Sequence, residues 1–86
     1  MSELHAHRLK RLHMRSMRRG IKEMDILLSA YAEGALAQMS PANLDLYDDL
    51  LQENDQDLYQ WVTGQTATPE RFAVMVGEIA QTHQKE

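Results

Sequence analysis

The sequence predicts an all-α fold, a compact bundle of five short helices in a single domain of 86 residues. Apolar residues recur at spacings of three and four along the chain, whereas the alternation with period two that is typical of strands is absent. Helix start and stop signals divide this pattern at four points. A mass of 9.9 kDa excludes a second hydrophobic core. We therefore expect one domain over residues 1–86, with flexible ends at about 1–5 and 84–86.

The first two predicted helices meet at a basic corner. The first covers about residues 4–18 and has a thin apolar stripe of Leu9, Leu12 and Met17. It is expected to end at Arg18-Arg19-Gly20, because cations favour a helix C-terminus and glycine accepts the left-handed conformation that often follows one. The second begins near Ile21 and runs to about Leu36. Its core-facing stripe consists of Met24, Leu27, Leu28, Tyr31 and Ala35.

Local start signals place the remaining three helices. Ser40-Pro41 starts the third, which runs to about Gln52, because serine accepts a backbone N–H and proline has the φ of a first helical residue. Asp55 is the expected N-cap of a short fourth helix that Gly64 closes, and Thr68-Pro69-Glu70 opens the fifth. The predicted core residues are Leu44, Tyr47, Leu50 and Leu51, then Leu58, Trp61 and Val62, then Phe72, Met75, Val76, Ile79 and Ala80.

The charge is distributed unevenly along the chain. Residues 1–22 carry a net charge of +6 and residues 23–86 carry −10. This asymmetry predicts a cationic surface that meets phosphates or carboxylates, although a solvated basic helix balanced by acidic neighbours explains it equally well. A stripe of arginines at positions 8, 11, 15 and 18 makes a small nucleic-acid-binding module the alternative function. The acidic remainder, and the absence of aromatic residues between the arginines, argue against that alternative.

The sequence indicates neither a catalytic site nor a metal site. It has no cysteine, which excludes a disulfide framework, a zinc ribbon and a thiol nucleophile. His5 and His7 would point about 200° apart on a helix, which is wrong for joint ligation. Glycine-rich phosphate loops are absent, and no apolar stretch approaches the roughly 20 residues of a membrane span. The arginine-rich start also resembles a transit peptide, but it runs directly into the first helix, so we do not predict one.

The segment from Arg18 to Asp25 is the most informative part of the chain. It places two cations, one glycine and two carboxylates at a corner between two helices. Glycine lets the backbone of a partner approach closely, and the planar Arg19 guanidinium matches a carboxylate or a phosphate. The same residues are also explained as ordinary helix-end signals. Residue chemistry alone leaves both interpretations open.

This segment resembles the R-G-x-x-E motif of the succinate dehydrogenase flavinylation factors, also called FAD assembly factors. The motif Arg19-Gly20-x-x-Glu23 is followed by Met24-Asp25 and an apolar helix ending in Tyr31-Ala32-Glu33. Similarity extends to a preceding basic run and to a second block: Arg11-Leu12, Arg15-Ser16 and Arg18, then Leu50-Leu51 through Asp55, Asp57-Leu58-Tyr59 and Trp61. The resemblance covers about residues 9–83. It departs at Met14 and Met17, where relatives often carry aromatic residues.

The resemblance implies a five-helix protein that docks on the flavoprotein subunit of succinate dehydrogenase, and in some bacteria of fumarate reductase. It implies a chaperone-like assembly factor, not an enzyme with its own turnover, that promotes covalent attachment of FAD to a histidine of that subunit. No cofactor is then bound stably by the factor itself. Which client is used, the oligomeric state and the role of His5, His7 and His13 stay open.

By position in the motif, Arg19, Gly20 and Glu23 would form the docking surface, and this role requires Arg19 and Glu23 to be presented outward. Arg18, Ile21 and Asp25 would contribute to that surface. We expect Gly20→Arg and Glu23→Ala to leave the fold near native while removing covalent flavin from the client. The short segment before the motif favours a bacterial cytoplasmic location.

Overall fold

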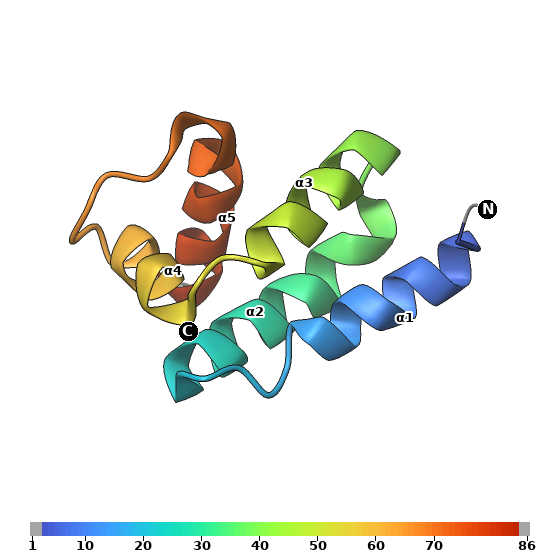
Figure 1. The fold of residues 1–86 in the computed structure, drawn as a ribbon, viewed down its shortest axis with the longest axis horizontal. Helices are drawn as coiled ribbons and strands as arrows, with labels where there is room; N and C mark the ends of the chain where they lie inside the picture. The colour runs from blue at the N-terminus through green and yellow to red at the C-terminus, as the bar shows by residue number, and fades with distance from the viewer. Residues whose placement is uncertain (1–2, 85–86) are drawn as a thin grey trace.

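The computed structural model describes residues 3–84, and within them the chain forms five α-helices, two single-turn 3₁₀ helices and no strand. The elements are α1 (His5–Arg15), α2 (Lys22–Ala35), η1 (Leu36–Gln38), α3 (Pro41–Leu51), α4 (Asp55–Val62), η2 (Glu70–Phe72) and α5 (Ala73–Gln84) (Figure 1). This confirms the predicted all-α fold of five helices. The predicted flexible ends fall partly on residues 1–2 and 85–86, which lie outside the described residues.

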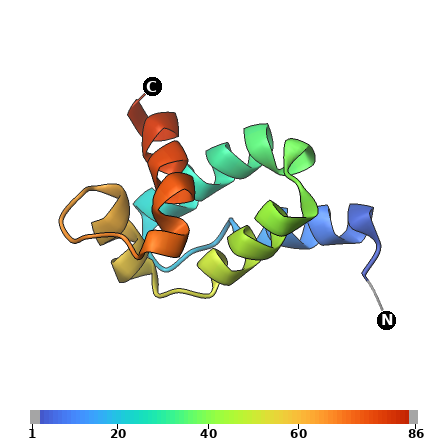
Figure 2. The same ribbon diagram turned by 90° about the horizontal axis from the view of Figure 1, so that it is seen from above.

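The central element of the fold is α2, which contacts α1 on one side and both α4 and α5 on the other. Figures 1 and 2 show α1 alongside α2, α4 and α5 together at one end of the molecule, the start of α1 at the other end, and α3 between them. The overall extents are 39 × 24 × 23 Å. Within residues 3–84, no helix combines the length and the apolar character that crossing a membrane requires.

The hydrophobic core is made mainly by α2, α3 and α5, as their apolar stripes predict. The buried apolar side chains include Met24, Leu27, Leu28 and Tyr31 of α2, Leu44, Tyr47, Leu50 and Leu51 of α3, and Met75, Val76 and Ile79 of α5. Ser16 is fully buried, and its hydroxyl lies 2.6 Å from the Tyr47 hydroxyl. This bond satisfies both polar groups, and burial raises the pKa of Tyr47 to about 12.

The predicted helix starts and stops are confirmed at several positions. Ser40 caps α3 by accepting the backbone N–H of Asn43 at 3.2 Å, with Pro41 as the first helical residue. Gly64 follows α4 with a φ of 79°, as the left-handed residue of a helix end. The N-cap of α4, however, is Asn54, which accepts the Gln56 N–H at 2.8 Å. Asp55 was the predicted cap, but its carboxylate is engaged elsewhere.

The corner between α1 and α2 differs most from the prediction. The first helix ends at Arg15, three residues early, and Ser16 Oγ donates to the Leu12 carbonyl at 2.8 Å. Arg18, not Gly20, adopts the left-handed conformation, with a φ of 57°. Since the helix ends before it, Met17 leaves the apolar stripe and is 48% exposed. The chain therefore turns over six residues, 16–21, which we call the elbow.

Candidate functional site

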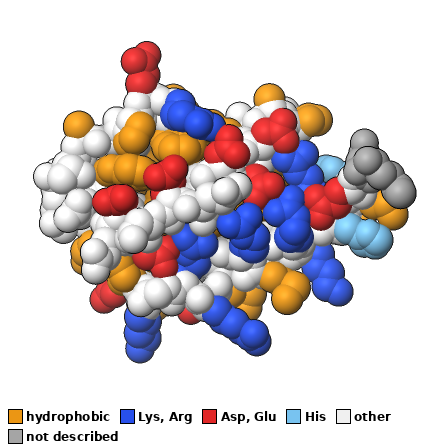
Figure 3. All heavy atoms as spheres, in the orientation of Figure 1, with side chains coloured by type: hydrophobic (Ala, Val, Ile, Leu, Met, Phe, Trp, Pro, Cys, Tyr) orange, Lys and Arg blue, Asp and Glu red, His pale blue; other side chains and the backbone are white. Residues whose placement is uncertain are grey.

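Ion pairs join α1 to α3 ahead of the elbow. Arg8 pairs with Asp45, and Arg11 donates to both oxygens of Asp48 at 3.1 and 2.9 Å. Arg15 also donates to Asp48, at 2.9 Å. Figure 3 shows the resulting mixture of basic and acidic side chains where the two helices meet. Three arginines of the predicted cationic stripe are thus paired with two aspartates of α3, which argues against the nucleic-acid alternative.

The Arg11 guanidinium controls the protonation of its two carboxylate partners. It donates to Glu3 through Nε and Nη2, both at 3.0 Å, in addition to Asp48. These hydrogen bonds lower the pKa of Glu3 and of Asp48 below their ordinary values. The pKa of Arg11 is raised in return. The basic N-terminal helix is therefore held to an acidic neighbour and is not a free cationic surface.

Arg19 lies inside the elbow and connects three helices. Its Nε donates to Asp55 Oδ1 at 2.8 Å, and Nη2 lies 2.6 Å from the same oxygen. Nη1 donates to the carbonyl of Arg15 at 2.9 Å and Nη2 to that of Leu51 at 3.1 Å. Those carbonyls belong to the last residues of α1 and α3, where a cation satisfies acceptors that the helix leaves unpaired.

This geometry corrects the expected presentation of Arg19. Its side chain is only 11% exposed, and its donors serve the protein's own carboxylate and carbonyls. The planar Arg19 guanidinium was expected to bind a partner. It instead fixes the shape of the elbow. The first residue of the motif is therefore a positioning residue.

Gly20 is held against the same carboxylate. Its backbone N–H donates to Asp55 Oδ2, so one carboxylate at the start of α4 binds two consecutive residues of the elbow. A Cβ built on Gly20 would lie 3.2 Å from Asp55 Oδ2, which is tighter than an ordinary contact. The close approach favours glycine here, whereas its φ does not, because that angle is not in the left-handed region.

The other four predicted site residues divide between the surface and the interior. Glu23, in the first turn of α2, and Arg18 are both exposed. Ile21 is half-buried and packs against the core. Asp25 is also half-buried, with the Ser29 hydroxyl donating to its Oδ1 at 3.4 Å. Outward presentation is therefore observed for Glu23 and Arg18, but Ile21 and Asp25 face partly inward.

Exposed methionines adjoin these charges, at the two positions where the sequence departs from the family it resembles. Met14 is 60% exposed and Met17 is 48% exposed, and both line a shallow surface hollow together with Arg18. Met14, Met17, Arg18, Gly20 and Glu23 are referred to below as the elbow surface. The early end of α1 turns Met17 outward, whereas Met14 lies on the exposed face of α1 itself. Within residues 3–84, no group of three or more histidines or acidic residues is arranged to hold a metal ion.

Comparison with known proteins places this chain in a family. A model of the family described as flavinator of succinate dehydrogenase matches residues 10–83. Succinate dehydrogenase assembly factor 2-B, mitochondrial, of Drosophila mojavensis is 36% identical over 78 residues, which cover 88% of this chain and 50% of the relative. The mitochondrial assembly factor 2 of Kluyveromyces lactis is 45% identical over 65 residues, covering 72% of this chain and 40% of the relative.

The chain spans half or less of the length of these curated relatives. Their names also correct one expectation. They are mitochondrial proteins of eukaryotes, which contradicts the predicted bacterial cytoplasmic location. The length of chain before the motif was a poor guide to location, because it carries no information about compartment.

Proposed function

The chain belongs to the family of flavinators of succinate dehydrogenase, and on that basis we propose that it is a succinate dehydrogenase assembly factor. In this role it binds the flavoprotein subunit and promotes covalent attachment of FAD to a histidine of that subunit. The observation that carries the proposal is the family match over residues 10–83, which spans the elbow and its intact motif.

The elbow surface is the proposed docking site. It combines two exposed methionines with the charges of Arg18 and Glu23 at its edge. Flexible thioethers adapt to the shape of a partner, and charges around an apolar centre fix the orientation of the complex. Behind this surface, Arg19 and Asp55 keep the elbow in one conformation. A preformed surface loses less conformational freedom on binding than a mobile one.

The proposed mechanism is assistance to a reaction that takes place on the client. A bound factor favours an ordered flavin site only if it binds that conformation better than the alternatives. Holding the client histidine and the flavin in a near-attack geometry then accelerates bond formation, while the flavin supplies the chemistry. We propose that FAD stays on the client, since this sequence has no glycine-rich phosphate loop.

Glu23→Ala tests the docking site. Glu23 is exposed, so we expect the melting temperature of the purified variant to lie within a degree or two of that of the wild type. The variant should lower covalent flavin on the client subunit at least about fivefold. Cells lacking the protein would be complemented with each variant, and flavin fluorescence of the subunit measured in a denaturing gel. Glu70→Ala is the matched control, because it removes an exposed first-turn carboxylate on η2. Full flavinylation with Glu23→Ala would contradict the docking site, and full flavinylation without the protein would contradict the function.

A further inference from the structure

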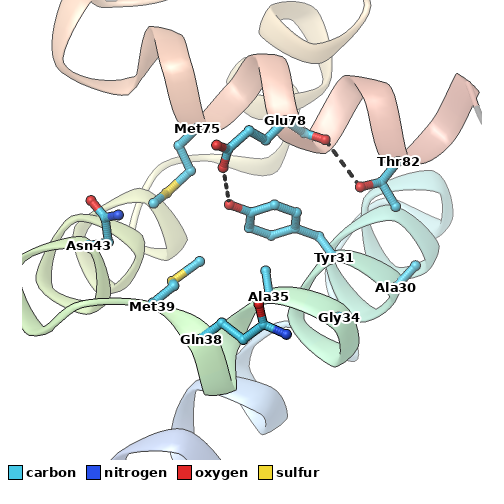
Figure 4. A pocket seen from close by; sticks show the side chains of 10 residues that line it. All are labelled: Ala30, Tyr31, Gly34, Ala35, Gln38, Met39, Asn43, Met75, Glu78 and Thr82. Atoms are coloured by element: carbon cyan, nitrogen blue, oxygen red, sulfur yellow. Dashed lines mark hydrogen bonds between the residues drawn. The ribbon is translucent and has the colours of Figure 1, made fainter.

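A second surface hollow opens between α2 and α5, away from the elbow. Its volume is about 520 Å³, and its walls come from α2, η1, the start of α3 and α5. Figure 4 shows Met39 and Met75 pointing toward one another across it, with the Tyr31 ring beside them. Gly34 on its rim lies twelve residues after Lys22, or roughly 18 Å along the helix axis. This α2–α5 cavity is therefore distinct from the elbow surface.

Among the described residues, Glu78 is the one charged side chain that lines the α2–α5 cavity, and no described lysine or arginine lines it. The Tyr31 hydroxyl donates to Glu78 Oε1 at 2.7 Å, which fixes the orientation of the carboxylate. Burial, together with this carboxylate, raises the pKa of the Tyr31 phenol, so it remains a donor. Among the lining residues, side-chain hydrogen bonds join Tyr31 to Glu78 and Thr82 to the Glu78 carbonyl (Figure 4). The second carboxylate oxygen therefore has no partner within the cavity.

The remaining walls suit an aliphatic chain with a polar end. Met39 and Met75 supply flexible apolar surface, and Asn43 contributes an amide at the rim. Gly34 leaves the entrance of the cavity open, because it has no side chain. It is exposed, and a Cβ there would meet no atom within 4 Å. Glycine in a helix interior is disfavoured relative to alanine. Neither close packing nor helix stability therefore explains why position 34 is glycine.

We propose that the α2–α5 cavity binds a basic side chain, arginine or lysine, of a partner polypeptide. The aliphatic stem would lie along Met39 and Met75, and the cationic end would bind the free oxygen of Glu78. An anionic occupant would face an unbalanced carboxylate, and a wholly apolar one would cover the second Glu78 oxygen without supplying a hydrogen-bond donor. The formal net charge of −4 on the whole chain adds a favourable field for a basic segment. The proposal goes beyond the flavin assembly role and does not depend on the identity of the client.

The experiment titrates the isotope-labelled full chain with the peptide acetyl-Ala-Leu-Arg-Leu-Ala-amide and follows its amide NMR signals. We expect saturable shifts at Gly34 and at the Asn43 side-chain amide. The same peptide with glutamine in place of arginine should shift them far less. Glu78→Gln should weaken binding about tenfold, as expected for loss of a charged hydrogen-bond acceptor. Glu33→Gln is the control, because it makes the same change at an exposed α2 position that does not line the cavity.

Two results would overturn the proposal. One is equal binding of the arginine and glutamine peptides, and the other is unchanged affinity in Glu78→Gln. Gly34→Leu provides an independent check, since it adds a side chain at the open rim where the Cβ meets no atom within 4 Å. This variant should keep the native circular dichroism spectrum and lose the peptide-induced shifts. Retained shifts in Gly34→Leu would also count against the cavity as the binding site. The assay contains no flavoprotein, so its result is separate from that of the flavinylation test.

Discussion

Asp55 has the largest structural role of any single carboxylate near the elbow, because it binds Arg19 and the Gly20 N–H together. We predict that Asp55→Asn destabilises the fold by about 1–3 kcal/mol, since it leaves the largely buried Arg19 guanidinium without its counter-charge. For a domain of this size, that loss lowers the melting temperature by about 4–8 °C per kcal/mol. Thermal unfolding followed by circular dichroism measures it. A melting temperature equal to that of wild type would show that Arg19 does not need this partner.

Gly20→Arg should act on the same contact. The added Cβ would press on Asp55 Oδ2, so the carboxylate that also binds Arg19 has to shift slightly. We now expect a loss of about 1–2 kcal/mol, in place of the near-native fold that the sequence analysis predicted. Urea unfolding of Gly20→Arg and Asp55→Asn, alone and combined, separates the possibilities. The two losses should be clearly less than additive if both act through the Asp55 contact.

Arg18 illustrates a conflict between stability and function within one residue. A non-glycine residue at a φ of 57° costs about 1–2 kcal/mol relative to right-handed backbone. Arg18→Gly should therefore raise the free energy of unfolding by roughly 0.5–1 kcal/mol, after the greater flexibility of unfolded glycine is subtracted. The same variant should lower covalent flavin on the client, because it removes a cation from the elbow surface. A stabilised variant with full flavinylation would exclude Arg18 from docking.

At the scale of elements, α1 is attached by charge more than by apolar contact. Leu12 is the only fully buried apolar residue of α1 as described, whereas three of its arginines pair with α3. Partly exposed ion pairs contribute about 0–1 kcal/mol each to stability. In 1 M salt the Debye length falls to about 3 Å, so these pairs are weakened by screening. We predict that backbone amides of α1 exchange with solvent faster than those of α2, and that 1 M NaCl accelerates α1 selectively. Hydrogen exchange measured by NMR tests this. Equal protection of the two helices at both salt concentrations would contradict it.

The same scale shows what the sequence could predict. Helix number, the stripes of α2, α3 and α5 and the Ser40 cap follow from local spacing and capping chemistry, which need no tertiary information. The pairing of Arg11 and Arg15 with Asp48 depends on α1 packing beside α3, more than thirty residues later. The arginines of α1 and the aspartates of α3 recur at the same spacings of three and four. This shared spacing was a signal in the sequence that the two helices pack with their charges paired.

The candidate site was only partly predictable for a related reason. Local chemistry marks Arg19, Gly20 and Glu23 as unusual, but it cannot say which of them faces the interior. Arg19 faces the interior because it binds Asp55. In the sequence, Asp55 is equally well explained as a helix cap. The exposure of Met17 likewise depended on α1 ending at Arg15, next to the buried Ser16–Tyr47 bond, which local spacing does not reveal.

At the scale of the whole molecule, the basic N-terminal part is joined to the acidic remainder, so global stability should depend on pH. Hydrogen bonds from Arg11 lower the pKa of Asp48 below its ordinary 3.8. The folded state then binds fewer protons at this group than the unfolded state does, and stability falls as pH falls. The contribution is fully present above about pH 4 and is lost below it, as pH passes through the lowered folded-state pKa.

Asp48→Asn should therefore flatten the acid limb of the stability curve. We predict a loss of about 1 kcal/mol at pH 7, because the pairs with Arg11 and Arg15 are partly exposed, and a smaller difference from wild type at pH 3. Urea unfolding at pH 7, 4 and 3 measures both. Asp49→Asn is the matched control on the same helix, since its pair with Arg71 is more than half exposed on both sides. If the gap between Asp48→Asn and wild type is as wide at pH 3 as at pH 7, the cost of the substitution lies in packing. The charge asymmetry of the sequence would then contribute to solubility and not to the cohesion of the fold.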